Sequence, residues 1–501
     1  MNRSSDFLIV GAGSAGCVVA RVLAEAGFQV RVVEAGPPRP PRRRPAEYLH
    51  TFDTADDWGY RTTPQSELAN RRLHWPRGRG PGGSTRINAM IWYPPRPTDL
   101  QMLHAHGGAA WAVNRLTESL QQVSDWVQPQ PPRWLSAASE RFLCCQQPAI
   151  DPPTAFARMG GRSGRRTAAD LLSESSAPAA AIELLTAQVD RVLFREEQAI
   201  GVQTLATDQA PSESWYAERG VILCGGSIAS PLLLMRSGIG PREMLAQAGI
   251  ELRSELPDVG QNLADHLIMP VVFALPSSQR FPAPFAPHDL ARWQIGGTGP
   301  IASNLAEAGA VYSLPLADRG REAETAEFQV HLTPTHYLLH PHPQAPAAMT
   351  IGVNLCRPQS RGQLRITTAD PAAPPEIDPA YLSVPADLER LAAAVDAARH
   401  LAADAALQTL VGEEKIPGGG RTSAAATIKA IRRFSQTLYH PVGTCRLGGD
   451  TASVVDSQCR VRGCQGLYVI DASVLPEIPS INPNATVMML AHHAASQLAA
   501  E

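Results

Sequence analysis

The chain has 501 residues and a formal net charge of −3 at pH 7, and 18% of its residues are charged. This length allows more than one domain, and the nearly balanced charge gives no electrostatic basis for binding nucleic acid or an anionic membrane. The sequence shows no signal-peptide pattern at its start, and no apolar run reaches the roughly 18 residues of a membrane span. We therefore expect a cytoplasmic protein with no membrane span and no nucleic-acid partner.

The N-terminal segment has the pattern of a dinucleotide-binding βαβ unit. An apolar run, Phe7–Val10, leads into Gly11-Ala-Gly-Ser-Ala-Gly16, and a second run, Val30–Val33, ends at Glu34. In such a unit the first glycine forms a tight turn, the second admits a pyrophosphate and the third lets the helix pack closely on the strand. The phosphates bind at the helix N-terminus, and a carboxylate at Glu34 would accept ribose hydroxyls and repel a 2′-phosphate. The segment therefore predicts FAD or NAD rather than NADP.

The next segments are predicted to return to the same sheet. A glycine-dense loop over Trp75–Met90 can place backbone amides against a flat polar ligand. Alternating apolar residues over 188–194 and 201–205 predict a hairpin. Residues 220–240 are typical of a buried strand, a tight turn, and a helix that begins at Ser230-Pro231 and ends at Gly238.

Two polar motifs lie near the C-terminus. His440 lies in Tyr439-His-Pro-Val-Gly-Thr-Cys445, before a predicted strand over 466–471, and Asn482 lies just before the last predicted helix. Asn-Pro is a common helix start, so Asn482 could cap that helix, and Asn484 could serve equally. We expect Asn484 to cap the helix and Asn482 to remain free.

We expect no metal site. The eight cysteines form no CxxC pair, which favours buried thiols. His336, His340 and His342 lie in or beside a proline-containing loop without an acidic cluster nearby.

At this point the sequence resembles the glucose-methanol-choline (GMC) family of FAD-dependent oxidoreductases, in particular its choline-dehydrogenase-like branch. Gly82-Gly-Ser-Thr85 through Asn88 is similar to the family's first signature, and residues 226–240 are similar to the second. Weaker similarities follow in the family's order over residues 256–266, 299–304 and 357–362.

The resemblance implies an α/β fold in which a Rossmann-like FAD-binding domain is interleaved with an α+β substrate-binding domain built on an antiparallel sheet. The FAD-binding domain would comprise residues 1–95, 160–275 and 440–501, and the substrate-binding domain residues 96–159 and 276–439.

The resemblance also implies which residues bind FAD. Some members attach FAD covalently through a histidine before the asparagine that matches Asn88, but this chain has Ile87 there, so we expect noncovalent FAD. The expected cofactor-binding residues are Gly11, Gly13, Ser14, Ala15, Gly16, Glu34, Ala35, Arg77, Gly83, Ser84, Asn88, Ala89, Met90, Val189, Gly225, Asp471, Ala472, Asn484 and Thr486.

His440 and Asn482 are similar to the family's catalytic pair. An imidazole that titrates near neutrality suits removal of the hydroxyl proton, while hydride leaves the carbon for flavin N5. An amide at Asn482 can bond the same oxygen and orient the carbinol hydrogen.

The resemblance thus implies oxidation of a small-molecule alcohol, expected to be primary, to a carbonyl. No motif decides whether oxygen, a quinone or a redox protein accepts the electrons. The alternative is a non-oxidative enzyme of the same fold, such as a hydroxynitrile lyase or a fatty-acid photodecarboxylase, because Cys356-Arg357-Pro-Gln-Ser360 superficially resembles a photodecarboxylase stretch.

Overall fold

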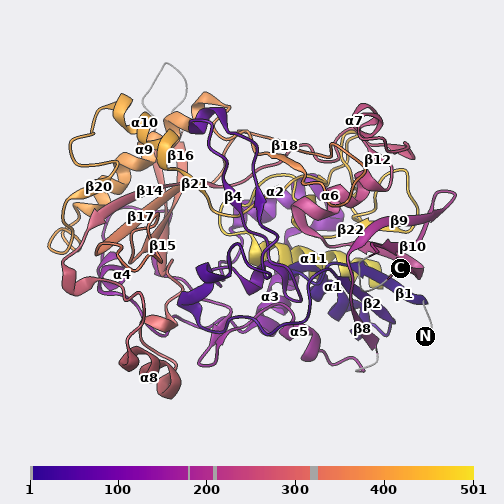
Figure 1. Ribbon diagram of the computed structural model, residues 1–501, viewed down its shortest axis with the longest axis horizontal. Helices are drawn as coiled ribbons and strands as arrows, with labels where there is room; N and C mark the ends of the chain where they lie inside the picture. The colour runs from indigo at the N-terminus through magenta and orange to yellow at the C-terminus, as the bar shows by residue number, and fades with distance from the viewer. Residues whose placement is uncertain (1–3, 179–180, 207–210, 316–324) are drawn as a thin grey trace.

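The structure, a computed structural model, describes residues 4–178, 181–206, 211–315 and 325–501. Two seven-stranded sheets dominate it, and Figure 1 shows them side by side with helix α11 close to the first. The helices are α1 (Ser14–Glu25), α2 (Pro97–Gly107), α3 (Val113–Val127), α4 (Ala137–Phe142), α5 (Asp170–Ser173), α6 (Gly226–Arg236), α7 (Arg242–Gln247), α8 (Pro287–Gly296), α9 (Pro385–Ala402), α10 (Ala424–Phe434) and α11 (Asn484–Ala499).

The first sheet is built around the N-terminal βαβ unit. Its strands run in the order β8 (Ile182–Thr186), β2 (Val30–Glu34), β1 (Ser4–Val10), β11 (Ser214–Leu223), β10 (Gln198–Thr204) and β9 (Val189–Arg195), and β22 (Leu467–Val469) also pairs with β11. The pairs of β1 with β2 and β11 are parallel, with Val10 opposite Val33 and Leu223. Because parallel strands end at one edge, the segments after Val10, Val33 and Leu223 gather there. The predicted hairpin of β9 and β10 is confirmed as an antiparallel pair.

The second sheet is antiparallel. Its strands run in the order β20 (Glu414–Ile416), β14 (Leu267–Ala274), β17 (Ala348–Leu355), β16 (Thr325–Thr333), β15 (Ala308–Pro315) and β5 (Asp151–Ala155), and β21 (Gln436–Thr437) also pairs with β14. Two-stranded pairs complete the described strands: β3 (Tyr60–Arg61) with β4 (His74–Trp75), β6 (Gly160–Gly161) with β7 (Gly164–Arg165), β12 (Ile239–Gly240) with β13 (Ser254–Glu255), and β18 (Gln363–Arg365) with β19 (Glu376–Asp378).

Each sheet has its own apolar core. Helices α1, α3 and α11 share the core of the first sheet, and α9 and α10 share that of the second. The fold is therefore the predicted α/β fold, a Rossmann-like sheet combined with an antiparallel one. The domain limits stay a prediction, and strand β14 pairs in the second sheet although those limits place its residues in the FAD-binding domain.

Two local predictions were wrong. Helix α6 begins at Gly226 rather than at Ser230-Pro231, so Pro231 lies inside it. Proline has no N–H for the carbonyl of Ser227, and that carbonyl instead accepts the hydroxyl of Thr444 at 2.7 Å, which makes the interior proline tolerable.

The cap of α11 also differs from the prediction. Pro483 is the cap residue and makes no side-chain cap. Asn484 does not cap the helix because its amide oxygen accepts the hydroxyl of Ser14 at 2.8 Å. Six of the eight cysteines are buried as expected, whereas Cys144 is exposed and Cys464 is half-buried. In the described part of the chain, no helix has both the length and the apolar character that crossing a bilayer requires.

Candidate active site

A cavity of about 1330 Å³ is lined by residues from both sheets. Val10 and Val33 line it from the ends of the first-sheet strands, and Ile268, His331 and Thr333 line it from the second sheet. The cavity therefore joins the edge of the first sheet to the second sheet, which is where a cofactor and a substrate could meet.

Glycine contacts hold the first-sheet edge together. A Cβ at Gly16 would collide with the carbonyl oxygen of Gly11, so only glycine lets α1 pack this closely on the turn. A Cβ at Gly83 would lie 2.6 Å from the Cα of Gly13, so the two glycine loops touch backbone to backbone. This leaves a backbone cradle beside the N-terminus of α1, which suits a pyrophosphate.

Glu34 ties three loops to this cradle. Its buried carboxylate accepts the backbone N–H groups of Ala12, Gly36 and Gly80, each at 2.9 Å. A carboxylate has about four lone-pair sites, so roughly one remains for a ribose hydroxyl. Glu34 also lines the cavity, so the same side chain can organise the loops and meet a cofactor.

The structure brings most of the predicted cofactor-binding residues together around the cavity. Gly16, Met90 and Thr486 do not line it, although the buried Thr486 hydroxyl has no hydrogen-bond partner within the described part of the chain. The predicted residues that line it are Gly11, Gly13, Ser14, Ala15, Glu34, Ala35, Arg77, Gly83, Ser84, Asn88, Ala89, Val189, Gly225, Asp471, Ala472 and Asn484.

Asp471 is engaged mainly by the protein. Its buried carboxylate accepts the hydroxyl of Ser230 at 2.6 Å, the N–H of Gly226 at 2.8 Å, and both the N–H and the hydroxyl of Ser473. Burial raises its pKa in spite of these bonds. Its visible role is to tie α6 to the segment after β22, and its contact with a cofactor stays a prediction.

His440 and Asn482 meet at the cavity, as the sequence predicts. The Nδ2 of Asn482 lies 3.3 Å from the Nε2 of His440, and the Oδ1 of Asn482 accepts the amide of Gln329 from strand β16 at 3.2 Å. Both His440 and Asn482 line the cavity. An acceptor nitrogen and an amide donor therefore face the same space, which is the arrangement that can take a proton from a hydroxyl and bind its oxygen.

The backbone around His440 is tightly constrained. Tyr439 has a φ of 67°, in the left-handed region that a bulky residue rarely adopts. Its N–H donates to Thr437 at 2.7 Å, and its carbonyl accepts the guanidinium of Arg77. The N–H of His440 donates to Asp265 at 2.7 Å. These contacts fix the direction in which the imidazole leaves the chain.

Two buried histidines, His266 and His331, lie near the half-buried His440. The Nδ1 of His440 lies 3.0 Å from the Nδ1 of His266, whose Nε2 lies 3.1 Å from the carbonyl oxygen of Cys356. Burial lowers the pKa of His266 to about 4 and that of His331 to about 3. Burial, together with the nearby titratable rings of His266 and His331 and the charge of Arg77, places the pKa of His440 well below 6.5. All three rings are therefore neutral at pH 7, the state that a general base requires.

Sequence analysis missed several residues of the site. His266, His331 and Gln329 come from β14, β16 or their ends, where alternation predicts burial but not a role. Arg165 is also buried, and its guanidinium holds the carbonyl and the side-chain oxygen of Asn88 at 2.6 and 2.9 Å. No local motif marks these residues, because their contacts join segments far apart in the sequence.

The stretch that suggested a photodecarboxylase lies outside the cavity lining. Cys356 is fully buried, and burial raises the pKa of its thiol. The guanidinium of Arg357 pairs with Asp99 at 3.0 Å and with Glu477 at 3.5 Å. Neither side chain is placed to meet a substrate.

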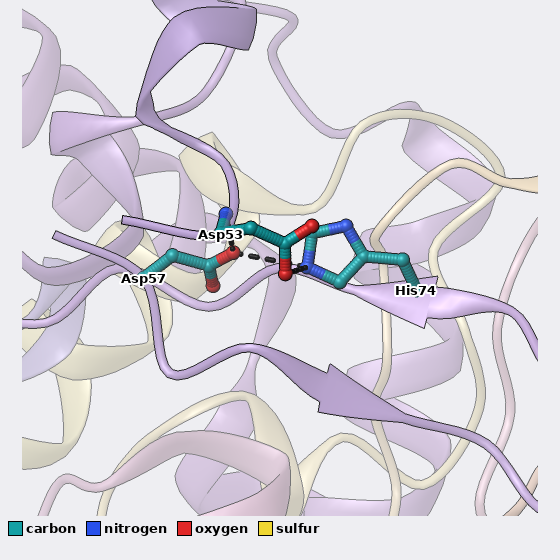
Figure 2. Close-up of side chains that lie close together, drawn as sticks. All are labelled: Asp53, Asp57 and His74. Atoms are coloured by element: carbon teal, nitrogen blue, oxygen red, sulfur yellow. Dashed lines mark hydrogen bonds and ion pairs between the residues drawn. The ribbon is translucent and has the colours of Figure 1, made fainter. Parts of the chain in front are cut away.

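One cluster of possible metal ligands, Asp53, Asp57 and His74, is accounted for by its hydrogen bonds. Figure 2 shows both carboxylates approaching the same ring nitrogen, with Asp57 at 3.0 Å and Asp53 at 3.4 Å. Asp57 also accepts the N–H groups of Asp53, Gly59 and Arg77. Its lone pairs are used by the protein, so the cluster serves to anchor the loop that carries Arg77.

The first sheet and the glycine turn after β1 have the arrangement of a dinucleotide-binding fold. Residues 5–268 and 358–491 match the models of the N-terminal and C-terminal parts of GMC oxidoreductase. The chain belongs to the GMC oxidoreductase family.

Characterised relatives agree with this assignment over the whole chain. An alcohol dehydrogenase [acceptor] of Pseudomonas putida is 32% identical over 530 residues, covering 98% of this chain and 95% of that protein. An oxygen-dependent choline dehydrogenase of Yersinia pseudotuberculosis is 32% identical over 542 residues, covering 98% and 93%. The crystal structure of pyridoxine 4-oxidase from Mesorbium loti superposes with a TM-score of 0.84 at 29% identity, covering 99% of both chains. The chain is therefore an enzyme, an oxidoreductase that acts on alcohol-like small molecules.

The cofactor of this family is FAD, and the residues of this chain fit it. The glycine cradle offers room for a pyrophosphate, and the carboxylate of Glu34 retains a site for a ribose hydroxyl. Ile87 lines the cavity and offers no atom that could form a covalent bond to the flavin.

Proposed function

We propose that the chain oxidises an uncharged alcohol to a carbonyl, with His440 as the general base. The observation that carries the proposal is the His440–Asn482 pair, whose Nε2 and Nδ2 atoms lie 3.3 Å apart at the cavity wall. FAD, when bound, accepts the hydride that leaves the carbinol carbon.

The two side chains divide the work at the hydroxyl group. The Nε2 of His440 takes the hydroxyl proton, and the Nδ2 of Asn482 donates to the oxygen as it gains negative charge. The bond from Gln329 to the Oδ1 of Asn482 holds the amide with its Nδ2 toward the oxygen. The products are a carbonyl, a protonated His440 and the reduced cofactor, so charge and electrons balance.

The part of the lining that residues 268–341 contribute favours a substrate without a formal charge, whereas charged residues such as Arg61 and Glu376 line the cavity from other segments. Within the described part of residues 268–341, the lining side chains include no carboxylate, lysine or arginine. Aromatic rings of Tyr48, Phe52 and Tyr337 provide apolar contact area, and Arg77 adds a positive charge near Tyr439 that would repel a cation. Choline carries a quaternary ammonium, so we expect it to be a poorer substrate than a neutral primary alcohol of similar size.

The names of the two relatives differ in the electron acceptor, since one is given as oxygen-dependent and the other as using an unspecified acceptor. Oxygen, a quinone or a redox protein could reoxidise the cofactor. Reducing the enzyme anaerobically and then adding air or a soluble quinone would separate these acceptors by the rate at which the oxidised flavin spectrum returns.

The proposal is tested by flavin absorbance. Oxygen-free holoenzyme is mixed with a panel of neutral aliphatic, aromatic and polyol alcohols, with choline included. We expect bleaching by at least one neutral alcohol, and a decrease of about 10²- to 10⁴-fold in its rate for His440→Ala. His493→Asn is the matched control, because His493 is a buried histidine that contacts Ala110 and does not line the cavity. Bleaching at the wild-type rate in His440→Ala would refute the assigned base.

A further inference from the structure

The His266 and His440 rings meet through atoms of the same kind. Their Nδ1 atoms lie 3.0 Å apart, and the ring planes are nearly perpendicular, at 80°. Two neutral imidazole nitrogens form a hydrogen bond only when one of them carries a proton and the other does not. The contact therefore couples the tautomers of the two rings.

The other side of His266 decides which nitrogen carries the proton. Its Nε2 lies 3.1 Å from the carbonyl oxygen of Cys356, and a carbonyl can only accept. The Nε2 of His266 is therefore the donor. Because the buried ring is neutral, its Nδ1 has no proton and must accept from the Nδ1–H of His440.

We propose that His266 is a positioning residue that holds His440 in the Nδ1–H tautomer and so keeps the Nε2 of His440 without a proton, as a base requires. This inference rests on the proposed function only for its catalytic consequence, since the tautomer follows from the contacts alone. It gives His266 a defined role in the reaction although it touches no substrate.

The hydrogen bonds that Asn482 makes agree with this tautomer in the direction of donation. With Nε2 of His440 unprotonated, the Nδ2 of Asn482 can donate to it, and the Oδ1 of Asn482 then accepts from Gln329. Every donor in this chain of bonds points toward the carbonyl of Cys356. The opposite tautomer of His440 would set N–H against N–H at Asn482 and leave two bare nitrogens facing each other at His266.

The groups around the pair do not offer His440 a different partner. Asp265 binds the backbone N–H of His440, whereas Arg77 and His331 are only electrostatic neighbours of its ring, and Arg77 is the one that is charged at neutral pH. Among the residues that the structure describes, His266 and Asn482 are the two whose side chains bond the His440 ring. When His440 becomes protonated, its Nδ1–H continues to donate to the neutral His266, so this hydrogen bond persists while the Nδ2 of Asn482 turns its donation to the substrate oxygen.

The first experiment measures the tautomer itself. Holoenzyme labelled with ¹⁵N-histidine is examined by long-range ¹H–¹⁵N correlation, and the His440 signals are assigned by their loss in His440→Ala. We expect a protonated nitrogen at Nδ1 and a bare nitrogen at Nε2, and in His266→Leu we expect this preference to weaken. A protonated Nε2 with a bare Nδ1 in the wild type would overturn the proposal. This measurement needs no substrate, so it decides the inference even if no alcohol reduces the flavin and the proposed function fails.

The second experiment measures how His266 affects the rate of flavin reduction. His266→Leu removes the acceptor, whereas His266→Asn keeps an oxygen at the position of Nδ1. We expect His266→Leu to lower the limiting rate of flavin reduction by about 10- to 100-fold and to shift its pH profile. His266→Asn should restore much of the rate, and His493→Asn should leave rate and profile unchanged.

Two outcomes of the second experiment would count against the proposal. A wild-type rate and pH profile in His266→Leu would show that His440 needs no such partner. Equal loss in His266→Leu and His266→Asn would show that the acceptor atom is not what matters. If His266→Leu fails to fold, the Asn variant and the wild-type spectrum still decide the question.

Discussion

At the scale of single residues, burial adjusts His440 to its proposed role as a base. Burial and the neighbouring rings of His266 and His331 lower its pKa well below 6.5. A lowered pKa means that the neutral form persists to lower pH than in a free histidine. The proposed base is therefore ready at every pH near neutrality.

The lowered pKa of His440 predicts the direction in which the rate of flavin reduction changes with pH. The rate of anaerobic flavin reduction should be constant near and above neutral pH and should fall only as the pH drops through a value below 6.5. Stopped-flow reduction by a saturating alcohol, from about pH 5 to 9, measures the profile, with flavin absorbance checked at each pH. An inflection above 6.5 assigned to His440 would contradict the environment described for this ring.

His331 provides a second residue-scale prediction. It lies on the same face of β16 as Gln329 and lines the cavity, and neither of its buried ring nitrogens has a hydrogen-bond partner among the residues that the structure describes. We expect substrate to supply that partner, since an unsatisfied buried group costs about 1–3 kcal/mol. His331→Phe should raise KM about 10- to 100-fold for an alcohol with a second polar group and change it little for a hydrocarbon alcohol. Equal effects on both alcohols would argue against this role.

Among the residues of the site, some could be predicted from the sequence and others could not. His440 and Asn482 were predictable because each lies in a short motif and the family order adds context. His266 contacts His440, which lies 174 positions away in the sequence, and His331 lines the cavity. No local sequence pattern indicates such a contact. Strand alternation predicts that these side chains are buried, but not that they face a reacting group.

At the scale of elements, the first βαβ unit was well predicted because Gly11 and Gly16 each have a steric reason. The errors came from competition between local signals. Ser230-Pro231 is a typical helix start, but the hydroxyl of Thr444 satisfies the carbonyl that the proline leaves open, so α6 begins earlier. Asn484 is a good cap by type, but Ser14 engages its oxygen.

The packing of α1 gives a prediction at this scale. A methyl group at residue 16 would collide with the carbonyl of Gly11, so Gly16→Ala must displace α1 from the turn that cradles the pyrophosphate. We expect purified Gly16→Ala to carry little FAD and to unfold at lower denaturant concentration, by about 1–3 kcal/mol as for other overpacked sites. Gly420→Ala is the control, because a Cβ there meets no atom within 4 Å. Full FAD content in Gly16→Ala would show that the turn can yield.

At the scale of the whole molecule, the chain leaves and re-enters each sheet several times. Strand β22 joins the first sheet from residues 467–469, and β5 joins the second from residues 151–155. The family resemblance implied this interleaving together with domain limits, and those limits stay a prediction. They assign β14 to the FAD-binding domain, whereas it pairs in the second sheet; β14 is apolar on both faces and would suit either sheet. The cavity between the sheets is the common boundary of both parts.

A cofactor in that cavity should stabilise both parts and should be removable. Ile87 cannot form a covalent link, so denaturing the enzyme with acid should leave the yellow colour in the supernatant and a colourless pellet. Apoprotein prepared under mild conditions should melt at a lower temperature than holoenzyme, and added FAD should restore the difference, because a ligand at 100 times its Kd stabilises the folded state by about 2.7 kcal/mol. NADP at the same concentration is the control, since the carboxylate of Glu34 would repel its 2′-phosphate. Flavin that stays with the acid pellet would show a covalent bond through another residue and would overturn the expectation drawn from Ile87.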